Sequence, residues 1–317
     1  MVLALLIVAA AGCGSAGLTP PTLWPYTVAA HAPSEIRVRV GTRVVTVAFE
    51  DYVAGTAVSE ITPVGESTNT VATVYDAQTV VARTYAVAHL GRHASEGFDV
   101  CDTTHCQLYE PARLGTSRFA TAVRQAAART AGQVLTWQGR PIDAVFHADC
   151  GGHTASPAQV WGTAPLPYLP SEPDTVPEVQ HRTWTVTVTK EQVRSALNGD
   201  RATAVGPSIT DVAVAAFDAS GRAETVRITG ARWIELRGDE FRAALTRVLG
   251  PKGLPSTRFT VTRTRTGYQF SGTGFGHGVG LCQQGMLARA RRGTGVRAIL
   301  SDFFPGTAVS RLDGRIP

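Results

Sequence analysis

The segment Gly274-Phe275-Gly276-His277-Gly278-Val279-Gly280-Leu281-Cys282-Gln283-Gln284-Gly285-Met286 decides how this chain is interpreted. Five of its first twelve residues are glycine, which is too many for the interior of a helix or a strand. Such a run predicts a tight turn whose backbone closely approaches a ligand or another segment. Because a histidine, a cysteine and two glutamines lie in the same turn, the segment indicates a functional site rather than core.

A second segment has the same character: His147-Ala148-Asp149-Cys150-Gly151-Gly152-His153-Thr154. It lies far from the first in sequence. We expect the fold to bring the two segments together around one cleft.

The composition is that of an ordinary globular protein. The 317 residues, 44% hydrophobic and 17% charged, suffice for a full core in one large domain or two smaller ones. The net charge is +5 and the pI about 9.1, and the only tight basic cluster is Arg289, Arg291 and Arg292. A mild, dispersed positive charge favours anionic partners such as a cell envelope and does not indicate nucleic-acid binding.

The N-terminus is typical of an export signal. Residues 2–11 are apolar and are followed by Gly12 and Cys13, so we interpret residues 1–13 as a signal peptide ending in a lipobox-like cysteine. The apolar run is too short to span a bilayer, so the only predicted membrane attachment is a lipid on Cys13. Residues 14–34 are predicted to be a flexible tether, and the expected localisation is the cell envelope, outside the cytoplasm.

The remaining residues, 35–317, predict one α+β domain, because strands and helices mix without regular βαβ alternation. A change in the sequence pattern, with strictly alternating strands, marks residues 182–258 as a possible inserted subdomain. An acidic, proline-containing segment at 171–177 precedes it and is predicted to be an exposed linker. The predicted hairpins are 36–49, 133–146 (strands 133–137 and 142–146), 209–229 and 259–273, with a strand at 183–189. The predicted helices are 51–61, 71–89, 117–131, 190–197, 238–249, 286–292 and 296–304.

Seven motifs in order resemble the SpoIID/LytB family of bacterial cell-wall proteins. They run through Ala57-Val58-Ser59-Glu60, residues 77–86, 101–109 and 146–154, Leu254-Pro255-Ser256-Thr257-Arg258-Phe259, residues 274–285, and Phe304-Pro305-Gly306-Thr307. The resemblance covers residues 36 to 312. It implies peptidoglycan glycan strands as the substrate. Sporulation members resemble lytic transglycosylases, whereas LytB-type members are described as enhancers of a separate cell-wall amidase, so both an enzyme and a non-catalytic glycan-binding module are implied.

A lytic transglycosylase can work with one carboxyl group and without a cofactor. The acid protonates the glycosidic oxygen between N-acetylmuramic acid and N-acetylglucosamine. The resulting carboxylate then removes the proton from the C6 hydroxyl, which attacks C1 and closes a 1,6-anhydro ring. Such an acid must be protonated near neutral pH, which requires a pKa raised by partial burial.

The resemblance places Glu60 at the position of this catalytic acid. Glu60 also ends a mostly apolar helical stretch and precedes Pro63, a junction where a carboxyl can meet low polarity. By resemblance, a further set of residues binds the substrate or orients Glu60: Gln78, Arg83, Tyr85, His147, Thr154, His277 and Gln283. Arg83 is the candidate for holding the lactyl carboxylate of muramic acid.

The segment Cys101-Asp102-Thr103-Thr104-His105-Cys106 has two interpretations. Cys101, His105 and Cys106 can supply three ligands to a structural zinc, which some members of the family carry near this position, with a fourth from His89, His93 or His147. Export to an oxidising compartment favours instead a Cys101–Cys106 disulfide.

The other two cysteines lie in the two glycine-containing segments, so a Cys150–Cys282 disulfide is also predicted. A thiol nucleophile paired as Cys150 with His147, or Cys282 with His277, is disfavoured. The members of each pair are close in sequence, whereas catalytic Cys/His partners usually meet only through the fold.

Overall fold

The computed structural model describes residues 33–250 and 252–312. The predicted signal segment, Cys13 and most of the tether lie outside these residues. The fold is α+β, as predicted, with several small sheets and no regular βαβ alternation. Within the described ranges, no helix combines the length and the apolar character needed to cross a membrane.

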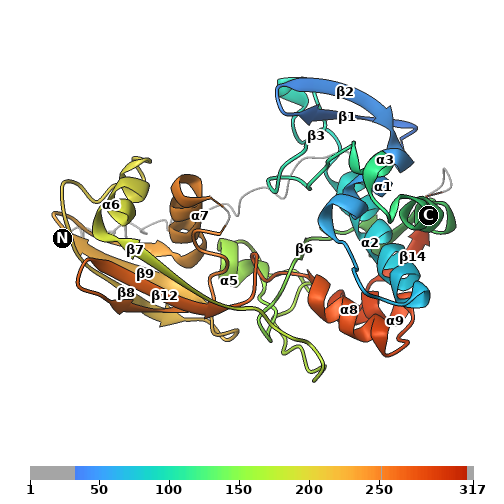
Figure 1. Ribbon diagram of the computed structural model, residues 1–317. Helices are drawn as coiled ribbons and strands as arrows, with labels where there is room; N and C mark the ends of the chain where they lie inside the picture. The colour runs from blue at the N-terminus through green and yellow to red at the C-terminus, as the bar shows by residue number, and fades with distance from the viewer. Residues whose placement is uncertain (1–32, 251, 313–317) are drawn as a thin grey trace, which may run out of the picture.

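Residues 33–161 and 281–312 form the part that we call the helical lobe (Figure 1). Its centre is α1 (Phe49–Glu60), packed on α2 (Thr68–Ala88) and α4 (Ala120–Arg129). Every residue of α1 from Tyr52 to Ser59 is buried, as expected for a helix that is apolar on all sides. α2 begins three residues earlier than predicted because the Ser67 side chain caps it by accepting from the Thr70 amide.

Shorter elements complete the helical lobe. They are the sheet of β1 (Glu35–Val40), β2 (Arg43–Ala48) and β3 (Val100–Cys101), and the helices η1 (Ala94–Glu96), α3 (Arg113–Thr116), α5 (Pro157–Trp161), α8 (Gln283–Arg291) and α9 (Val296–Phe303). Residues from α2, α8 and α9 share the lobe's largest hydrophobic cluster.

The predicted hairpin over residues 133–146 is wrong in its second strand. β4 (Gln133–Trp137) pairs only briefly with β5 (Arg140–Pro141), and its other edge pairs along its length with β14 (Ala308–Arg311). The chain leaves this sheet after Ile142, and β6 (Phe146–His147) pairs instead with β13 (Leu281–Cys282). The partner of β6 is distant in the sequence, so the local alternation of apolar and polar residues could not predict this pairing.

Residues 183–273 form a second part, the sheet lobe, with a hydrophobic cluster of its own that extends from Val188 to Phe270. One sheet has the order β11 (Phe259–Arg263), β12 (Gly267–Thr273), β7 (Thr183–Thr189), and the other has the order β10 (Trp233–Arg237), β9 (Ala223–Gly230), β8 (Ile209–Phe217). The helices α6 (Lys190–Asn198) and α7 (Gly238–Leu249) lie together on one side of these strands (Figure 1).

The two glycine-containing segments meet where the lobes join. Asp149 pairs with Phe275 and Ala155 with Val279, and Cys282 faces His147 in the β6–β13 pair. The sequence therefore correctly predicted that these segments lie together. Residues 171–177 are largely exposed, as predicted, since Glu172, Pro173, Thr175 and Pro177 are all exposed. The Asp174 side chain is the exception: it is fully buried and forms a salt bridge of 2.9 Å with Arg289 of α8.

Candidate functional site

Glu60 is the last residue of α1 and remains partly exposed. Its Oε1 accepts a hydrogen bond of 2.6 Å from the Leu108 amide, the only hydrogen bond to this carboxyl within the described residues. Burial raises its pKa from 4.5 to about 7, against the opposing effect of the Leu108 hydrogen bond. A carboxyl with this pKa populates both its acid and its base form near neutral pH.

The segment that follows Cys106 holds the end of α1 in place. Besides the Leu108 bond to Glu60, the Glu110 amide donates to Ser59 Oγ (2.9 Å) and Arg113 Nη1 donates to the Ser59 carbonyl (3.2 Å). Gln107 Nε2 donates to Tyr52 Oη and to the Ala82 carbonyl, which ties the same segment to α1 and α2. The position of the Glu60 carboxyl thus depends on residues 107–113.

Two of the predicted binding residues, Gln78 and Gln283, are paired with each other. Gln283 Nε2 donates to Gln78 Oε1 at 3.3 Å, and both side chains are buried. The buried Nε2 of Gln78 has no hydrogen-bond partner in the described part of the chain. One turn earlier on α2, Tyr75 Oη donates to the Ile61 carbonyl, next to Glu60 (3.2 Å). These contacts link the glycine-rich turn to α2, and α2 to the end of α1.

The two predicted histidines of the glycine-containing segments lie side by side, with ring centroids 5.4 Å apart. Burial lowers the pKa of His147 well below its usual value, and burial together with Arg242 and Arg222 lowers that of His277 to about 3. Both rings are therefore neutral at physiological pH. Trp161, which the sequence analysis did not single out, lies beside His277 at 5.3 Å.

Glycine is needed at two positions of this turn for separate reasons. Gly278 has φ +87°, and a Cβ there would lie 2.3 Å from the guanidinium of Arg222. Gly280 has φ +71°, and a Cβ would lie 2.2 Å from the Val145 carbonyl oxygen. The close approach inferred from the sequence is thus an approach to protein atoms.

Thr154 makes only internal contacts. Its hydroxyl donates to the Glu172 carbonyl (3.1 Å) and accepts from the Glu172 amide (3.0 Å). It therefore secures the chain around residue 172, and its predicted role in binding sugar has no support from these contacts.

Arg83 is fully buried, and the carboxylate that it holds belongs to the protein. Its Nε and Nη2 donate to the two oxygens of Glu50 at 2.9 and 2.6 Å. The guanidinium also donates to the carbonyls of residues 79, 127 and 133 and to Thr130 Oγ1. With these contacts Arg83 joins α1, α2, α4 and β4. Its guanidinium donors are used within the protein and are not available to bind a ligand carboxylate.

Tyr85 belongs to the hydrophobic cluster under the β1–β2–β3 sheet. Its ring stacks on His89 with centroids 4.0 Å apart, and its hydroxyl accepts from Arg92 Nη1 at 2.8 Å. Burial raises its pKa. It is packed in the core, with only 5% of its surface exposed.

The cysteine segment forms a four-donor cluster. Cys101, His105 and Cys106 are joined by His93, one of the three candidates for the fourth ligand, and one ligand atom from each lies within 4.8 Å of all the others. Cys101 and Cys106 are free thiols with their sulfurs 3.3 Å apart, whereas a disulfide needs about 2.05 Å. The hydrogen bond between the two thiols lowers the pKa of Cys101 to about 3 and raises that of Cys106.

This cluster fits the coordination preferences of zinc. With Zn–S of about 2.3 Å and Zn–N of about 2.05 Å, a tetrahedral site has donor-to-donor separations of roughly 3.3–3.8 Å. The separations of Cys106 Sγ from His93 Nε2 (3.5 Å) and of both sulfurs from His105 Nδ1 (3.7 Å) lie in that range. His93 Nδ1 is hydrogen-bonded to Glu96 at 2.6 Å, the outer carboxylate that metal-bound histidines commonly have.

Several residues of this region were missed by the sequence analysis. The Leu108 amide is a backbone group and carries no sequence signal. Glu96 was detectable as a carboxylate three residues after His93. The pairing of Asp149 with His181, 2.7 Å apart, was not detectable, because the two residues are 32 positions apart in sequence and only the fold brings them together.

Comparison with known proteins agrees with the motifs. A family described as SpoIID, stage II sporulation protein, matches residues 40–137, and a domain of unknown function, DUF8618, matches residues 176–280. The chain is 30% identical over 262 residues to an uncharacterized protein of Brachyspira hyodysenteriae, covering 82% of this chain and 66% of that protein.

Two relatives from Bacillus subtilis have descriptive names, and each is 27% identical to this chain. The amidase enhancer aligns over 278 residues, covering 74% of this chain and 37% of the enhancer, and stage II sporulation protein D aligns over 275 residues, covering 84% and 75%. The chain therefore spans about a third of the enhancer's length and just under two thirds of the Brachyspira protein. From the ordered motifs, the matched SpoIID region and these relatives, we conclude that residues 40–137 form a SpoIID-type region and that the chain is similar, over most of its length, to proteins of the SpoIID/LytB family.

Proposed function

We propose that this protein is an exported cell-wall protein that cleaves peptidoglycan glycan strands as a lytic transglycosylase. The observation that carries the proposal is the pKa of about 7 at Glu60, at the family position of the catalytic acid. In its neutral form Glu60 donates its proton to the glycosidic oxygen as the bond to C1 breaks. The carboxylate then accepts the proton of the C6 hydroxyl, whose oxygen bonds to C1, so the enzyme returns to its starting state.

Product analysis tests this proposal. Purified glycan strands, with and without their peptides, are incubated with the full chain, and the products are examined by mass spectrometry. Products ending in 1,6-anhydromuramic acid support the transglycosylase, whereas ordinary reducing ends would indicate hydrolysis by water and contradict it. Comparing the two substrates shows whether the peptides must be removed first.

A relative named amidase enhancer favours a second candidate, a non-catalytic module that binds glycan and stimulates a cell-wall amidase. The two candidates differ in one readout. If the chain binds glycan and accelerates a purified amidase but yields no anhydro product on its own, the enhancer function replaces the enzyme. We place both functions at the cell envelope, with the lipid on Cys13 as the proposed anchor.

The pH dependence of the enzyme follows from Glu60. Because the acid must be protonated when the substrate binds, we expect kcat/KM to be level below pH 7 and to fall about tenfold per pH unit well above it. Initial rates from pH 5 to 9 on one soluble glycan would measure this. Constant activity up to pH 9 would show that a group with a pKa near 7 is not the acid.

We also propose that His93, Cys101, His105 and Cys106 hold a structural zinc ion. The cluster precedes Leu108 by two residues, and the Leu108 amide holds Glu60, so the metal would fix the segment that positions the acid. We expect a strong chelator to lower the melting temperature by roughly 10 °C or more and to reduce glycan cleavage, both restored by added zinc.

Differential scanning fluorimetry with elemental analysis checks the zinc proposal. The Cys106→Ser variant should already be destabilised and should respond little to the chelator. Three results together would establish the disulfide instead. The purified protein would contain no zinc, its melting temperature would not change in chelator, and Cys101 and Cys106 would react with thiol reagents only after reduction.

A further inference from the structure

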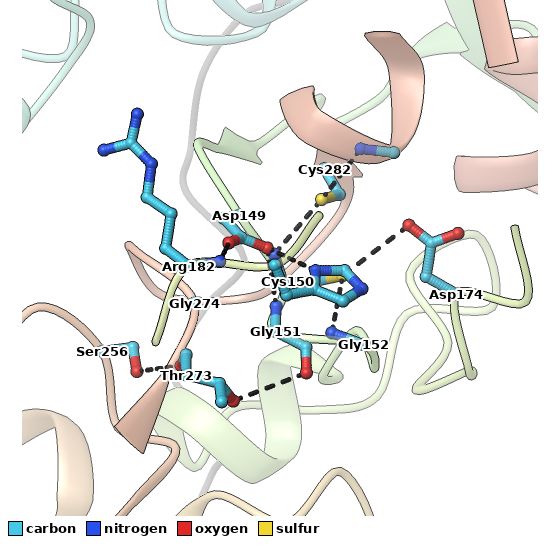
Figure 2. A network of polar contacts seen from close by, with 12 residues as sticks. Asp149, Cys150, Gly151, Gly152, Asp174, Arg182, Ser256, Thr273, Gly274 and Cys282 are labelled. Atoms are coloured by element: carbon cyan, nitrogen blue, oxygen red, sulfur yellow. Dashed lines mark hydrogen bonds and ion pairs between the residues drawn. The ribbon is translucent and has the colours of Figure 1, made fainter. Parts of the chain in front are cut away.

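A second cluster of metal-binding groups lies at the junction of the two lobes. It consists of His147, Cys150 and Cys282, whose ligand atoms all lie within 4.8 Å of one another. Both cysteines are fully buried and His147 is 4% exposed. The pairing of β6 with β13 sets Cys282 opposite His147, so the backbone fixes the relative positions of these two ligands (Figure 2 shows the two cysteines).

Both sulfurs are surrounded by amide donors. Cys282 Sγ accepts from the amides of Cys150 (3.2 Å) and Gly285 (3.3 Å), and Cys150 Sγ accepts from the amide of Gly152 (3.4 Å). Cys150 Sγ also donates to Asp174 Oδ2 at 3.8 Å, so this sulfur is a thiol in the protein without metal. A metal ion that binds both sulfurs would displace their protons, because the thiolate is the form of cysteine that binds metals.

His147 offers a free lone pair beside these sulfurs. Its Nδ1 is 3.1 Å from the Val279 carbonyl, which only accepts hydrogen bonds, so Nδ1 carries the proton and Nε2 does not. Nε2 is buried and has no hydrogen-bond partner within the described residues. A buried polar group without a partner is unfavourable, so a ligand that used this lone pair would relieve the cost. A ring whose Nδ1–H is bonded to a backbone carbonyl is the usual arrangement of a metal-binding histidine.

A buried cation lies next to the cluster. Arg222 is 1% exposed and donates to the Cys150 carbonyl at 2.7 Å. Burial lowers the pKa of Arg222 to about 10, and the nearby Asp218 opposes that shift, so the guanidinium already has one counter-charge. Thiolates at Cys150 and Cys282 would add a second.

We propose that His147, Cys150 and Cys282 form a buried three-ligand site for a soft, thiophilic d¹⁰ metal ion. Two thiolates and one imidazole suit Cu(I) or Zn(II), and the lack of a fourth protein ligand in the group favours Cu(I), because structural zinc sites are almost always four-coordinate. The metal would fasten the segment of residues 147–154 to the glycine-rich turn. This site is distinct from the Cys101–Cys106 cluster and does not depend on glycan cleavage.

Metal titration of the full chain tests the proposal. The Cys101→Ser/Cys106→Ser variant, fully reduced, is titrated with Zn(II) and, under anaerobic conditions, with Cu(I), each against a chromophoric chelator. We expect one bound equivalent of either metal, with Cu(I) bound more tightly. Adding Cys150→Ser and Cys282→Ser should abolish binding. His147→Gln should weaken it at least tenfold, whereas the control His153→Gln, from the same segment, should leave it unchanged.

The same titration can overturn the proposal. The site would be excluded if no metal bound while Cys150 and Cys282 both reacted with a thiol reagent after unfolding. Binding that survives the loss of Cys150 and Cys282 would exclude it too. Should the starting variant fail to unfold cooperatively, the wild type is compared with Cys150→Ser/Cys282→Ser. Loss of one equivalent supports the site, and an unchanged stoichiometry rejects it.

Discussion

Replacing Glu60 by glutamine should reduce the formation of anhydromuramic products by about 10²- to 10⁴-fold, the usual contribution of a general acid and base. Glutamine keeps the size of the side chain, and its amide oxygen can still accept from Leu108. It can neither protonate the glycosidic oxygen nor deprotonate the C6 hydroxyl. Quantifying products by mass spectrometry at pH 6, where the wild-type acid is protonated, measures the loss.

The same substitution should stabilise the protein above neutral pH. Because the folded-state pKa of Glu60 is raised, the folded protein retains the proton while the unfolded chain releases it between pH 4.5 and 7. The raised pKa therefore costs no stability below pH 4.5. Above pH 7 it lowers the free energy of unfolding by at most about 3 kcal/mol, and by less to the extent that solvent screens this partly exposed carboxyl. Glu60→Gln should therefore raise the melting temperature at pH 8 and change it little at pH 4.5.

The exposed Glu110 provides the matched control, since its amide binds Ser59 beside Glu60 but its side chain lies in solvent. Glu110→Gln should keep both activity and stability. A Glu60→Gln variant that retains wild-type cleavage would show that another group is the acid. Loss of cleavage with a lower melting temperature at pH 8 would indicate damage to the fold instead.

Replacing Arg83 by methionine should lower the free energy of unfolding by about 2–4 kcal/mol, because buried carbonyls lose their donor and Glu50, whose side chain is 41% exposed, loses its ion-pair partner. Methionine fills much of the volume but leaves the Glu50 carboxylate without its bidentate partner. It also leaves the carbonyls of residues 127 and 133 without the donor that Arg83 supplies. Urea denaturation monitored by circular dichroism gives the change.

Arg124 is the control for this experiment, because it also links α4 to α1 but at the surface. Its salt bridge to Asp51 is 3.0 Å long with both side chains more than half exposed, so Arg124→Met should cost less than about 1 kcal/mol. If Arg83→Met left stability unchanged and raised only KM for glycan, Arg83 would bind substrate, as the family resemblance implied. The contacts with Glu50 favour the structural role.

Local sequence was sufficient for most individual elements. Helices α1, α2, α6, α7 and α9 and the strands β7, β8, β9, β11 and β12 lie within a few residues of their predicted ranges, because apolar periodicity and glycine or proline stops are local signals. The ordered motifs also revealed the similarity to the SpoIID/LytB family, and the sequence placed Glu60 at the end of a mostly apolar helix. The residues that define the candidate acid could thus be read without a structure.

Only the tertiary structure decided the environment of these residues. The pKa of Glu60 depends on its burial and on the amide of Leu108, 48 positions away, and the burial of Arg83 depends on Glu50, 33 positions away. The pairing of β6 with β13 joins segments more than 130 residues apart and sets Cys282 against His147. Desolvation and hydrogen-bond partners are properties of the packed chain, so residue type and spacing alone cannot fix a pKa, a metal site or the choice between binding and structural roles.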